Sequence, residues 1–137
     1  VKIDENEKWL RNIKKLSLQK SRIYNLSSIG LFENLTHLTM NFSGFVGLVP
    51  NFDTLKCLNS LMITFNRGDI IELEKIDLGK MPCLKYLHLW ADGLKGIPLN
   101  IKNSNLDYIY VKHSHLTKAE MNIIKEYKKQ VTKAKAH

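Results

Sequence analysis

The sequence predicts an α/β fold, with one parallel sheet of about five short strands and a helix that caps the C-terminal end. Two observations predict it. The spacing apolar-x-x-apolar-x-apolar occurs five times within residues 13–116, at intervals of 22, 23, 26 and 22 residues. The segment 117–133 then has the apolar spacing of an amphipathic helix. A chain of 137 residues with 44% apolar content is enough for one domain with a real core.

The five copies of the pattern have the geometry of short strands. Alternate residues of a strand face opposite sides, so the second and third apolar positions, such as Leu87 and Leu89, point inward together. No single copy can bury its apolar side, so stacked copies must share one core. The second positions are therefore expected to form one inward file: Leu16, Leu38, Leu61, Leu87 and Ile109.

The pattern resembles the leucine-rich repeat, L-x-x-L-x-L-x-x-N-x-L, over roughly residues 10–116. The asparagine position holds small polar residues: Ser21, Ser43, Asn66, Asp92 and Ser114. The final apolar position matches at Ile23, Phe45, Leu94 and Leu116, whereas Gly68 departs from it. The resemblance implies a right-handed solenoid. Residues 1–137 would form a single domain: an N-terminal cap or flank (1–12), five repeats (13–116) and a capping helix (117–133).

Each copy is followed by a return segment that is also expected to be apolar inside. The third return is longer, and we expect a helical turn around residues 70–79. Its acidic residues alternate with apolar ones, which favours a solvated face over a calcium loop: Asp69, Glu72, Glu74 and Asp77. The expected inward residues of the four returns are Leu26, Ile29, Phe32, Leu48, Phe52, Leu55, Ile71, Leu73, Ile76, Leu78, Met81, Ile97 and Ile101.

Both ends of the stack need caps, because terminal copies would otherwise leave core and strand edges open. At the N-terminal end, Trp9 and Leu10 are predicted to plug the first copy. At the C-terminal end, Thr117 and Glu120 have the spacing of a capping box. The residues expected to face the last copy are Met121, Ile124 and Val131, with Ile123 and Tyr127 beside them.

Residues between the inward leucines point to the other face of the sheet, which is the concave face in the family. Stacking gives three outward columns, whose polarity falls toward the last two copies. The predicted contact residues are Tyr86, His88, Trp90, Tyr108, Tyr110, Lys112, Met62 and His37. Exposed aromatic residues are typical of protein interfaces. They are also ordinary strand residues that pack on their neighbours, so sheet packing without a ligand stays as the alternative.

The function implied by the resemblance is non-enzymatic recognition of a protein partner through the sheet face. The alternative is a structural or spacer segment of a larger receptor or effector without a ligand of its own. We found no Gly-rich phosphate loop, nucleophile elbow or H-E-x-x-H motif, and we predict no cofactor. The best metal candidate is the pair His113 and His115, but no third ligand is obvious, and no metal is predicted.

The net charge of +8 is concentrated at the two ends of the chain, +4 in residues 1–22 and +4 in residues 118–137. Nucleic-acid binders usually gather charge on one working face, so this distribution argues against a nucleic-acid partner. Cys57 and Cys83 hold equivalent positions, and we expect two reduced, mostly buried thiols rather than a disulfide. No run of about 18 apolar residues predicts a membrane span. A cytoplasmic location and secretion after signal removal both remain open.

Overall fold

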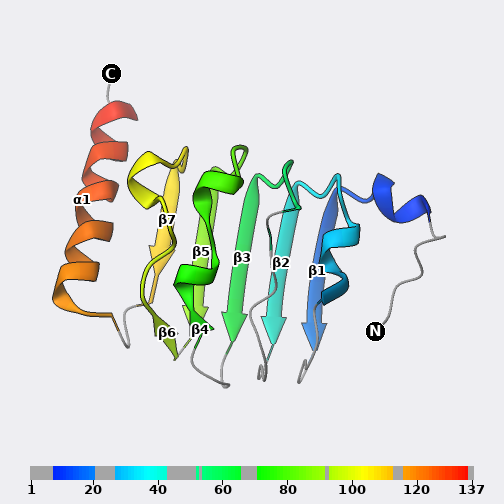
Figure 1. Cartoon of the computed structure of the whole chain (residues 1–137), viewed down its shortest axis with the longest axis horizontal. Helices are drawn as coiled ribbons and strands as arrows, with labels where there is room; N and C mark the ends of the chain where they lie inside the picture. The colour runs from blue at the N-terminus through cyan, green and yellow to red at the C-terminus, as the bar shows by residue number, and fades with distance from the viewer. Residues whose placement is uncertain are drawn as a thin grey trace.

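The computed structural model describes residues 8–20, 27–42, 52, 54–65, 71–91, 93–112 and 116–135. Its main feature is a parallel sheet in which each strand lies beside the next one along the chain (Figure 1). The five strands, in their order across the sheet, are β1 (Lys15–Lys20), β2 (His37–Phe42), β3 (Ser60–Phe65), β5 (Tyr86–Ala91) and β7 (Tyr108–Val111). The prediction of one parallel sheet of about five strands with a C-terminal helix is confirmed.

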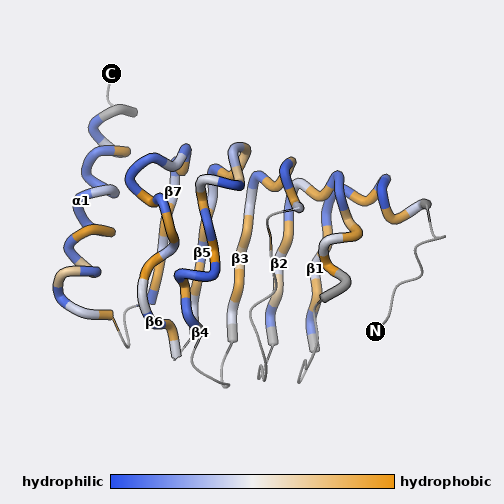
Figure 2. Tube along the Cα trace, viewed as in Figure 1, coloured by the Kyte–Doolittle hydropathy of each residue, from blue (hydrophilic) through white to orange (hydrophobic). Residues whose placement is uncertain are grey.

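The register of the sheet places the repeated leucines in one file. Leu16 pairs with Leu38, and the file continues through Leu61, Leu87 and Ile109. Figure 2 shows apolar residues recurring along each strand between more hydrophilic ones. Leu61 and Leu87 are fully buried. The three-then-two spacing of the leucines therefore reflects a bend followed by a strand whose alternate residues share a single core.

The described parts of the return segments lie together on one side of the sheet (Figure 1). They contain short 3-10 helices, and the third return holds two of them, so the expected helical turn is confirmed. The four helices are η2 (Ser27–Leu31), η3 (Leu73–Lys75), η4 (Leu78–Lys80) and η5 (Ile101–Asn103). A second small ladder, between β4 (Ile71–Glu72) and β6 (Leu94–Lys95), was not predicted. Two-residue strands are too short to produce a periodic signal.

The apolar residues of the returns complete the core. The buried ones include Phe32, Phe52, Leu55, Leu73 and Ile76, whereas Ile97 is partly buried. Leu26, Leu48 and the side chain of Ile71 lie outside the described residues. The predicted solvated acidic face agrees with Glu72 and Glu74, which are exposed, whereas Asp77 is half-buried and hydrogen-bonded. Its Oδ1 accepts hydrogen bonds from the backbone N–H of Gly79 at 2.9 Å and from Nδ2 of Asn100 at 2.7 Å. These bonds lower the pKa of the Asp77 carboxyl.

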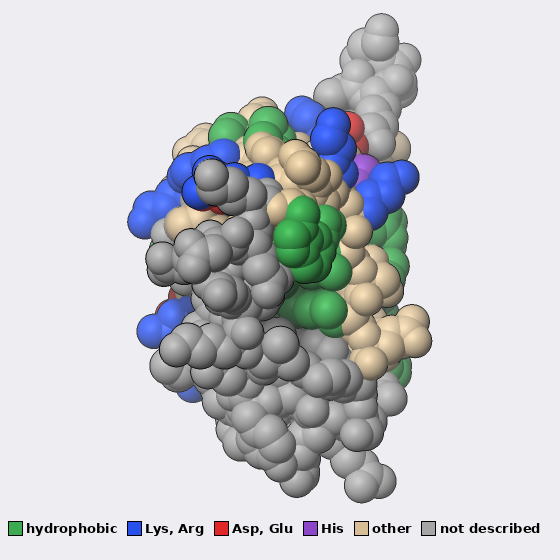
Figure 3. All heavy atoms as spheres, turned by 90° about the vertical axis from the view of Figure 1, so that its right-hand side faces the viewer, with side chains coloured by type: hydrophobic (Ala, Val, Ile, Leu, Met, Phe, Trp, Pro, Cys, Tyr) green, Lys and Arg blue, Asp and Glu red, His purple; other side chains and the backbone are tan. Residues whose placement is uncertain are grey.

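The N-terminal end corrects one prediction. Residues Lys8–Asn12 form the 3-10 helix η1, in which Leu10 is buried but Trp9 is 57% exposed. Consecutive residues of a 3-10 helix point about 120° apart, so Leu10 can plug the core only if Trp9 turns outward. Leu16 and Leu18 are only partly buried here. Figure 3, which views this end, shows hydrophobic side chains at the surface among polar ones.

The C-terminal end is covered by α1 (Lys118–Lys135), which packs beside β7 (Figure 1). The predicted capping box is present: the N–H of Thr117 donates to Oε1 of Glu120 at 2.9 Å, and the N–H of Glu120 donates to Oγ1 of Thr117 at 3.1 Å. Ile124 and Tyr127 are buried against the last strand, and the partly buried residues around them are Met121, Ile123 and Val131. Among the described helices, none is both long and apolar enough to cross a membrane.

Cys57 and Cys83 each stand just before the first apolar residue of a copy, and this position lies at the surface. Cys57 and Cys83 are free thiols, as expected, but both are exposed, so the expectation of burial is wrong. At the same position in other copies, Nδ2 of Asn34 donates to the carbonyl of Arg11, and Nδ2 of Asn105 donates to that of Pro82. These bonds lie in turns at the surface rather than in the core. The other predicted positions outside the described residues are Ser21, Ile23, Ser43, Phe45, Asn66, Gly68, Asp69, Asp92, Ser114, His113 and His115.

Candidate functional site

The strand register brings the predicted aromatic residues together on the outward face of β5 and β7. Tyr86 pairs with Tyr108, and His88 pairs with Tyr110. Their neighbours Leu87 and Ile109 point into the core, so these four rings stand on the opposite face. We call these four residues, together with Trp90 at the end of β5, the aromatic patch.

The rings of the aromatic patch stack on one another. The ring centroids of Tyr86 and Tyr108 are 4.4 Å apart with an interplanar angle of 7°, and those of His88 and Tyr110 are 4.9 Å apart at 17°. This spacing follows from the strand separation of about 4.8 Å. Because side chains stand perpendicular to a sheet, rings stacked in this way cover one another's faces and direct their edges and polar tips outward.

Two lysines extend the patch. Nζ of Lys112, just beyond β7, lies 4.4 Å from the centroid of the Trp90 ring. Nζ of Lys128, from α1, lies 5.5 Å from the centroid of Tyr110. Both contacts are cation–π interactions, which hold the ammonium groups at the edge of the aromatic patch. Lys128 was missed by the sequence analysis, although its signal was present: it follows Tyr127, which was already expected to lie near the last copy.

His88 sits at the centre of the patch in a defined chemical state. Its Nδ1 atom is buried and has no hydrogen-bond partner among the described residues. A buried N–H without a partner costs more than a buried lone pair, so this geometry favours the neutral tautomer that carries its proton on Nε2. Burial also lowers the pKa of His88 below the ordinary value of 6.5. The patch is therefore built around an uncharged histidine at neutral pH.

Tyr108 is the most exposed member of the stacked group, with 40% of its surface accessible. Its pKa is raised, first because the phenolate would be partly desolvated and then because Tyr86 lies close and is hydrogen-bonded to it. The hydroxyl therefore stays protonated at neutral pH. Because one of the two hydroxyls donates to the other, Tyr86 and Tyr108 together offer one free donor to a bound group.

The two remaining predicted contact residues, Met62 and His37, differ in their position relative to the aromatic patch. Met62 on β3 lies directly beside His88, so it borders the aromatic patch. His37 does not join it, because it lies on β2 and Ser60 separates it from Tyr86. Its Nδ1 is instead 2.9 Å from Oγ1 of Thr36. His37 therefore shares the predicted column with Tyr86 and Tyr108 but lies outside the group of stacked rings.

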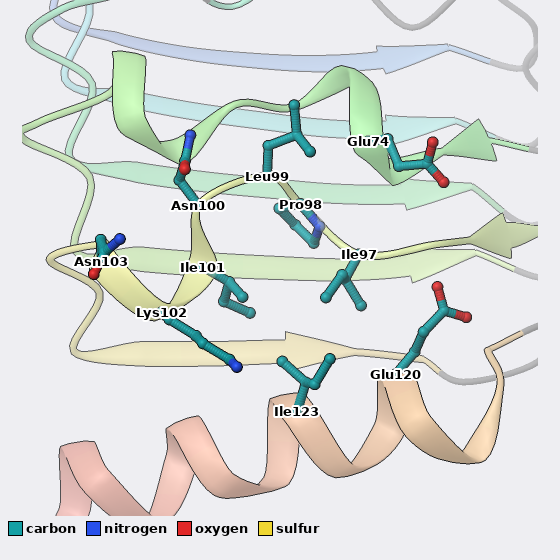
Figure 4. A pocket seen from close by; sticks show the side chains of 10 residues that line it. All are labelled: Glu74, Ile97, Pro98, Leu99, Asn100, Ile101, Lys102, Asn103, Glu120 and Ile123. Atoms are coloured by element: carbon teal, nitrogen blue, oxygen red, sulfur yellow. The ribbon is translucent and has the colours of Figure 1, made fainter.

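A separate hollow lies on the return side, between η5 and the start of α1. Its volume is about 370 Å³, and Ile97, Leu99 and Ile123 form much of its wall. Figure 4 shows Glu74 and Glu120 toward one end and Asn100 and Asn103 toward the other. Leu99 is 47% exposed here. This hollow could not be predicted from the sequence, because it depends on how α1 sits against the returns.

The chemistry of the described residues gives no sign of a metal centre. No group of three or more His, Cys, Asp or Glu side chains comes together among them. Comparisons of the chain with models of protein families, with curated protein sequences and with solved structures found no match. The function must therefore be inferred from the residues and their geometry.

Proposed function

We propose that this chain is a non-enzymatic recognition module that binds a protein partner through the aromatic patch. We further propose that its stacked copies are leucine-rich repeats wound into a right-handed solenoid, as their spacing suggests. The observation that carries the proposal is the gathering of five aromatic side chains on the outward face of two neighbouring strands. A partly exposed aromatic cluster of this kind is typical of the central part of a protein interface.

The stacking of the rings supports binding as well as sheet stability. Tyr86, His88, Tyr108 and Tyr110 are held in place by one another before any partner arrives. A partner therefore need not meet the entropy cost of ordering four mobile side chains, each of which would cost about 0.5–1.5 kcal/mol. A rigid aromatic surface is a favourable binding site for this reason.

The size of the face limits how the partner can bind. Five strands about 4.8 Å apart make a surface roughly 20 Å across, or on the order of 400 Å². A stable protein interface needs about 800 Å² on each partner. The partner must therefore reach beyond the strands, and α1 is the nearest surface, since Lys128 already contacts Tyr110.

The second candidate function is a spacer segment of a longer array of repeats. One observation favours it: Leu16 and Leu18 on β1 are only partly buried, whereas the equivalent Leu38 and Met40 on β2 are buried. No strand pairs with the outer side of β1 among the described residues. A further repeat stacked on β1 would complete that burial.

Alanine variants of the aromatic patch separate the two functions. Tyr86→Ala, Trp90→Ala and Tyr110→Ala should each keep the fold and lose a partner that the parent chain captures, measured by quantitative mass spectrometry of captured proteins. Leu99→Ala is the matched control, because Leu99 is an exposed apolar residue on the return side. It should retain the partner. If the patch variants retrieve the same partner as the parent, the recognition proposal fails and the spacer function is favoured.

A further inference from the structure

The outward side chains of the five strands include hydrogen-bond donors and cations but no carboxylate, and the exposed Asp107 directly precedes the last strand. The three outward columns of the sheet contain no Asp or Glu: Lys15, His37, Ser60, Tyr86, Tyr108; Ser17, Thr39, Met62, His88, Tyr110; Gln19, Asn41, Thr64, Trp90, Lys112. The polar groups of the patch and its edge are the phenol hydroxyls, the imidazole of His88 and the ammonium groups of Lys112 and Lys128. A surface of this kind complements a partner that supplies hydrogen-bond acceptors with negative charge.

Part of the ring-face area is occupied within the chain. Tyr86 and Tyr108 cover one face of each other, as do His88 and Tyr110, while Lys112 lies over Trp90 and Lys128 lies over Tyr110. Binding of single-stranded nucleic acid depends on open aromatic faces on which successive bases stack. The patch offers mainly ring edges and polar tips, so an anionic protein segment fits it better than a nucleic acid does.

Helix α1 extends the cationic edge beyond the sheet. Lys128 faces the patch, and Lys125 lies three residues earlier on the same side of the helix. The acidic residues Glu120 and Glu126 line the hollows on the return side. Lys128 and Lys125 thus lie toward the patch, whereas Glu120 and Glu126 lie toward the returns, where Glu126 pairs with Lys129 at 3.6 Å.

We infer that the patch binds an extended acidic protein segment, whose Asp and Glu carboxylates meet the phenol hydroxyls of Tyr86 and Tyr108 and the ammonium groups of Lys112 and Lys128. This inference rests on the proposed function and adds the chemistry of the partner. An extended segment running from the sheet onto the edge of α1 also supplies the contact area that the strands alone lack. Its binding should weaken as salt is raised, because charge pairs at an exposed edge are screened.

The direct test is isothermal titration calorimetry of the chain with a poly-L-glutamate peptide at about 0.15 M salt. The double variant Lys112→Glu with Lys128→Glu should bind about tenfold more weakly or worse. A second pair, Tyr86→Phe with Tyr108→Phe, removes the hydroxyls and keeps the stack. It should also bind more weakly, and it keeps the test valid if the charge-reversed chain fails to fold.

The matched control is Lys75→Glu with Lys95→Glu, which makes the same change in net charge on the return side, where both lysines are exposed. This control should bind poly-L-glutamate almost as the parent does. Three results would overturn the inference: no binding by the parent, equal weakening in the control, or displacement of poly-L-glutamate from the patch by single-stranded oligo-dT.

Failure of the inference of an acidic partner can be told apart from failure of the proposed recognition function. If alanine variants of the patch lose a captured protein while the lysine reversals still bind it, the recognition function stands and the acidic partner is wrong. If neither set of variants affects any captured protein, both proposals fail.

Discussion

At the scale of single residues, His88 shows how a ring on the outward face of a sheet packs against its neighbours. Its ring lies 4.9 Å from that of Tyr110, and 6.4 and 6.3 Å from those of Tyr86 and Tyr108. No carboxylate is among these ring neighbours, so none of them supplies a negative charge that would stabilise an imidazolium. The buried Nδ1 has no described partner that could accept a proton from it. Burial therefore favours the neutral ring.

We predict that His88 titrates below 6.5, the ordinary value for histidine. NMR measurement of the His88 ring protons against pH tests this. Tyr110→Ala should move the pKa back toward 6.5, because it exposes one face of the ring to water. A pKa at or above 6.5 in the parent chain would contradict the account of a desolvated ring.

The same shift predicts a pH dependence of stability. The folded pKa of His88 lies below the unfolded one, so the unfolded chain binds the proton more tightly. This residue's contribution to stability is complete above the unfolded value of about 6.5 and is lost as pH falls through the folded pKa. His88→Phe, which keeps an aromatic ring in the stack, should flatten the free energy of unfolding over that window, as measured by urea denaturation. An unchanged pH profile in this variant would show that His88 is not the group responsible.

At the scale of elements, α1 is fixed by its first turn and by one tyrosine. The capping box at Thr117 and Glu120 satisfies backbone donors at the N-terminus. The hydroxyl of Tyr127 donates toward the carbonyl of Leu106 at 3.0 Å and accepts from Oγ of Ser104 at 3.0 Å. These bonds set the rotation of the helix on the last strand, which in turn places Lys128 beside Tyr110.

Replacing the cap should lower stability by a predictable amount. Thr117→Ala should reduce the free energy of unfolding by about 0.5–2 kcal/mol, because the N–H of Glu120 loses its acceptor. Thr132→Ala is the matched control, since Thr132 is an exposed position inside α1 whose hydroxyl only bonds back to the carbonyl of Lys128. Alanine there should be neutral or slightly stabilising. Equal losses in both variants, measured by urea denaturation, would contradict the role of the capping box.

The sequence predicted these elements unevenly, for physical reasons. The strands and the register followed from a strict repeat, and the cap followed from side chains three residues apart. The orientation of Trp9 did not follow, because a single 3-10 turn leaves open which of two adjacent apolar residues faces inward. The β4–β6 ladder and the position of Lys128 also did not follow, since both depend on how segments far apart in the sequence pack together. The outward aromatic residues were predicted because strand parity alone fixes the face on which they stand.

At the scale of the whole molecule, the two ends of the stack differ. The β7 end is covered by α1, whereas Leu16 and Leu18 at the β1 end remain partly exposed. The polar outward residues lie toward β1, and the aromatic ones lie on β5 and β7. The surface proposed to bind a partner thus lies at the end that α1 covers. There β5 lies between β3 and β7, and β7 lies between β5 and α1.

This difference predicts unequal costs along one file of leucines. Leu87→Ala should lower the free energy of unfolding by about 2–5 kcal/mol, because it empties a fully buried site. Leu16→Ala makes the same chemical change in the same file but should cost clearly less, since Leu16 is only partly buried. Chemical denaturation of both variants provides the comparison. A loss at Leu16 as large as that at Leu87 would mean that the β1 end is covered in solution.

The central claim is that the register of β5 and β7 stacks the aromatic side chains on the outward face. A shift of one residue would turn every one of them into the core, so the claim can be tested directly. The most direct measurement is an NMR nuclear Overhauser spectrum of the chain with labelled tyrosine and histidine. It should show contacts between the rings of Tyr86 and Tyr108 and between those of His88 and Tyr110. The account would be contradicted if the rings showed contacts to buried methyl groups instead, such as those of the core residues around Leu87 and Ile109.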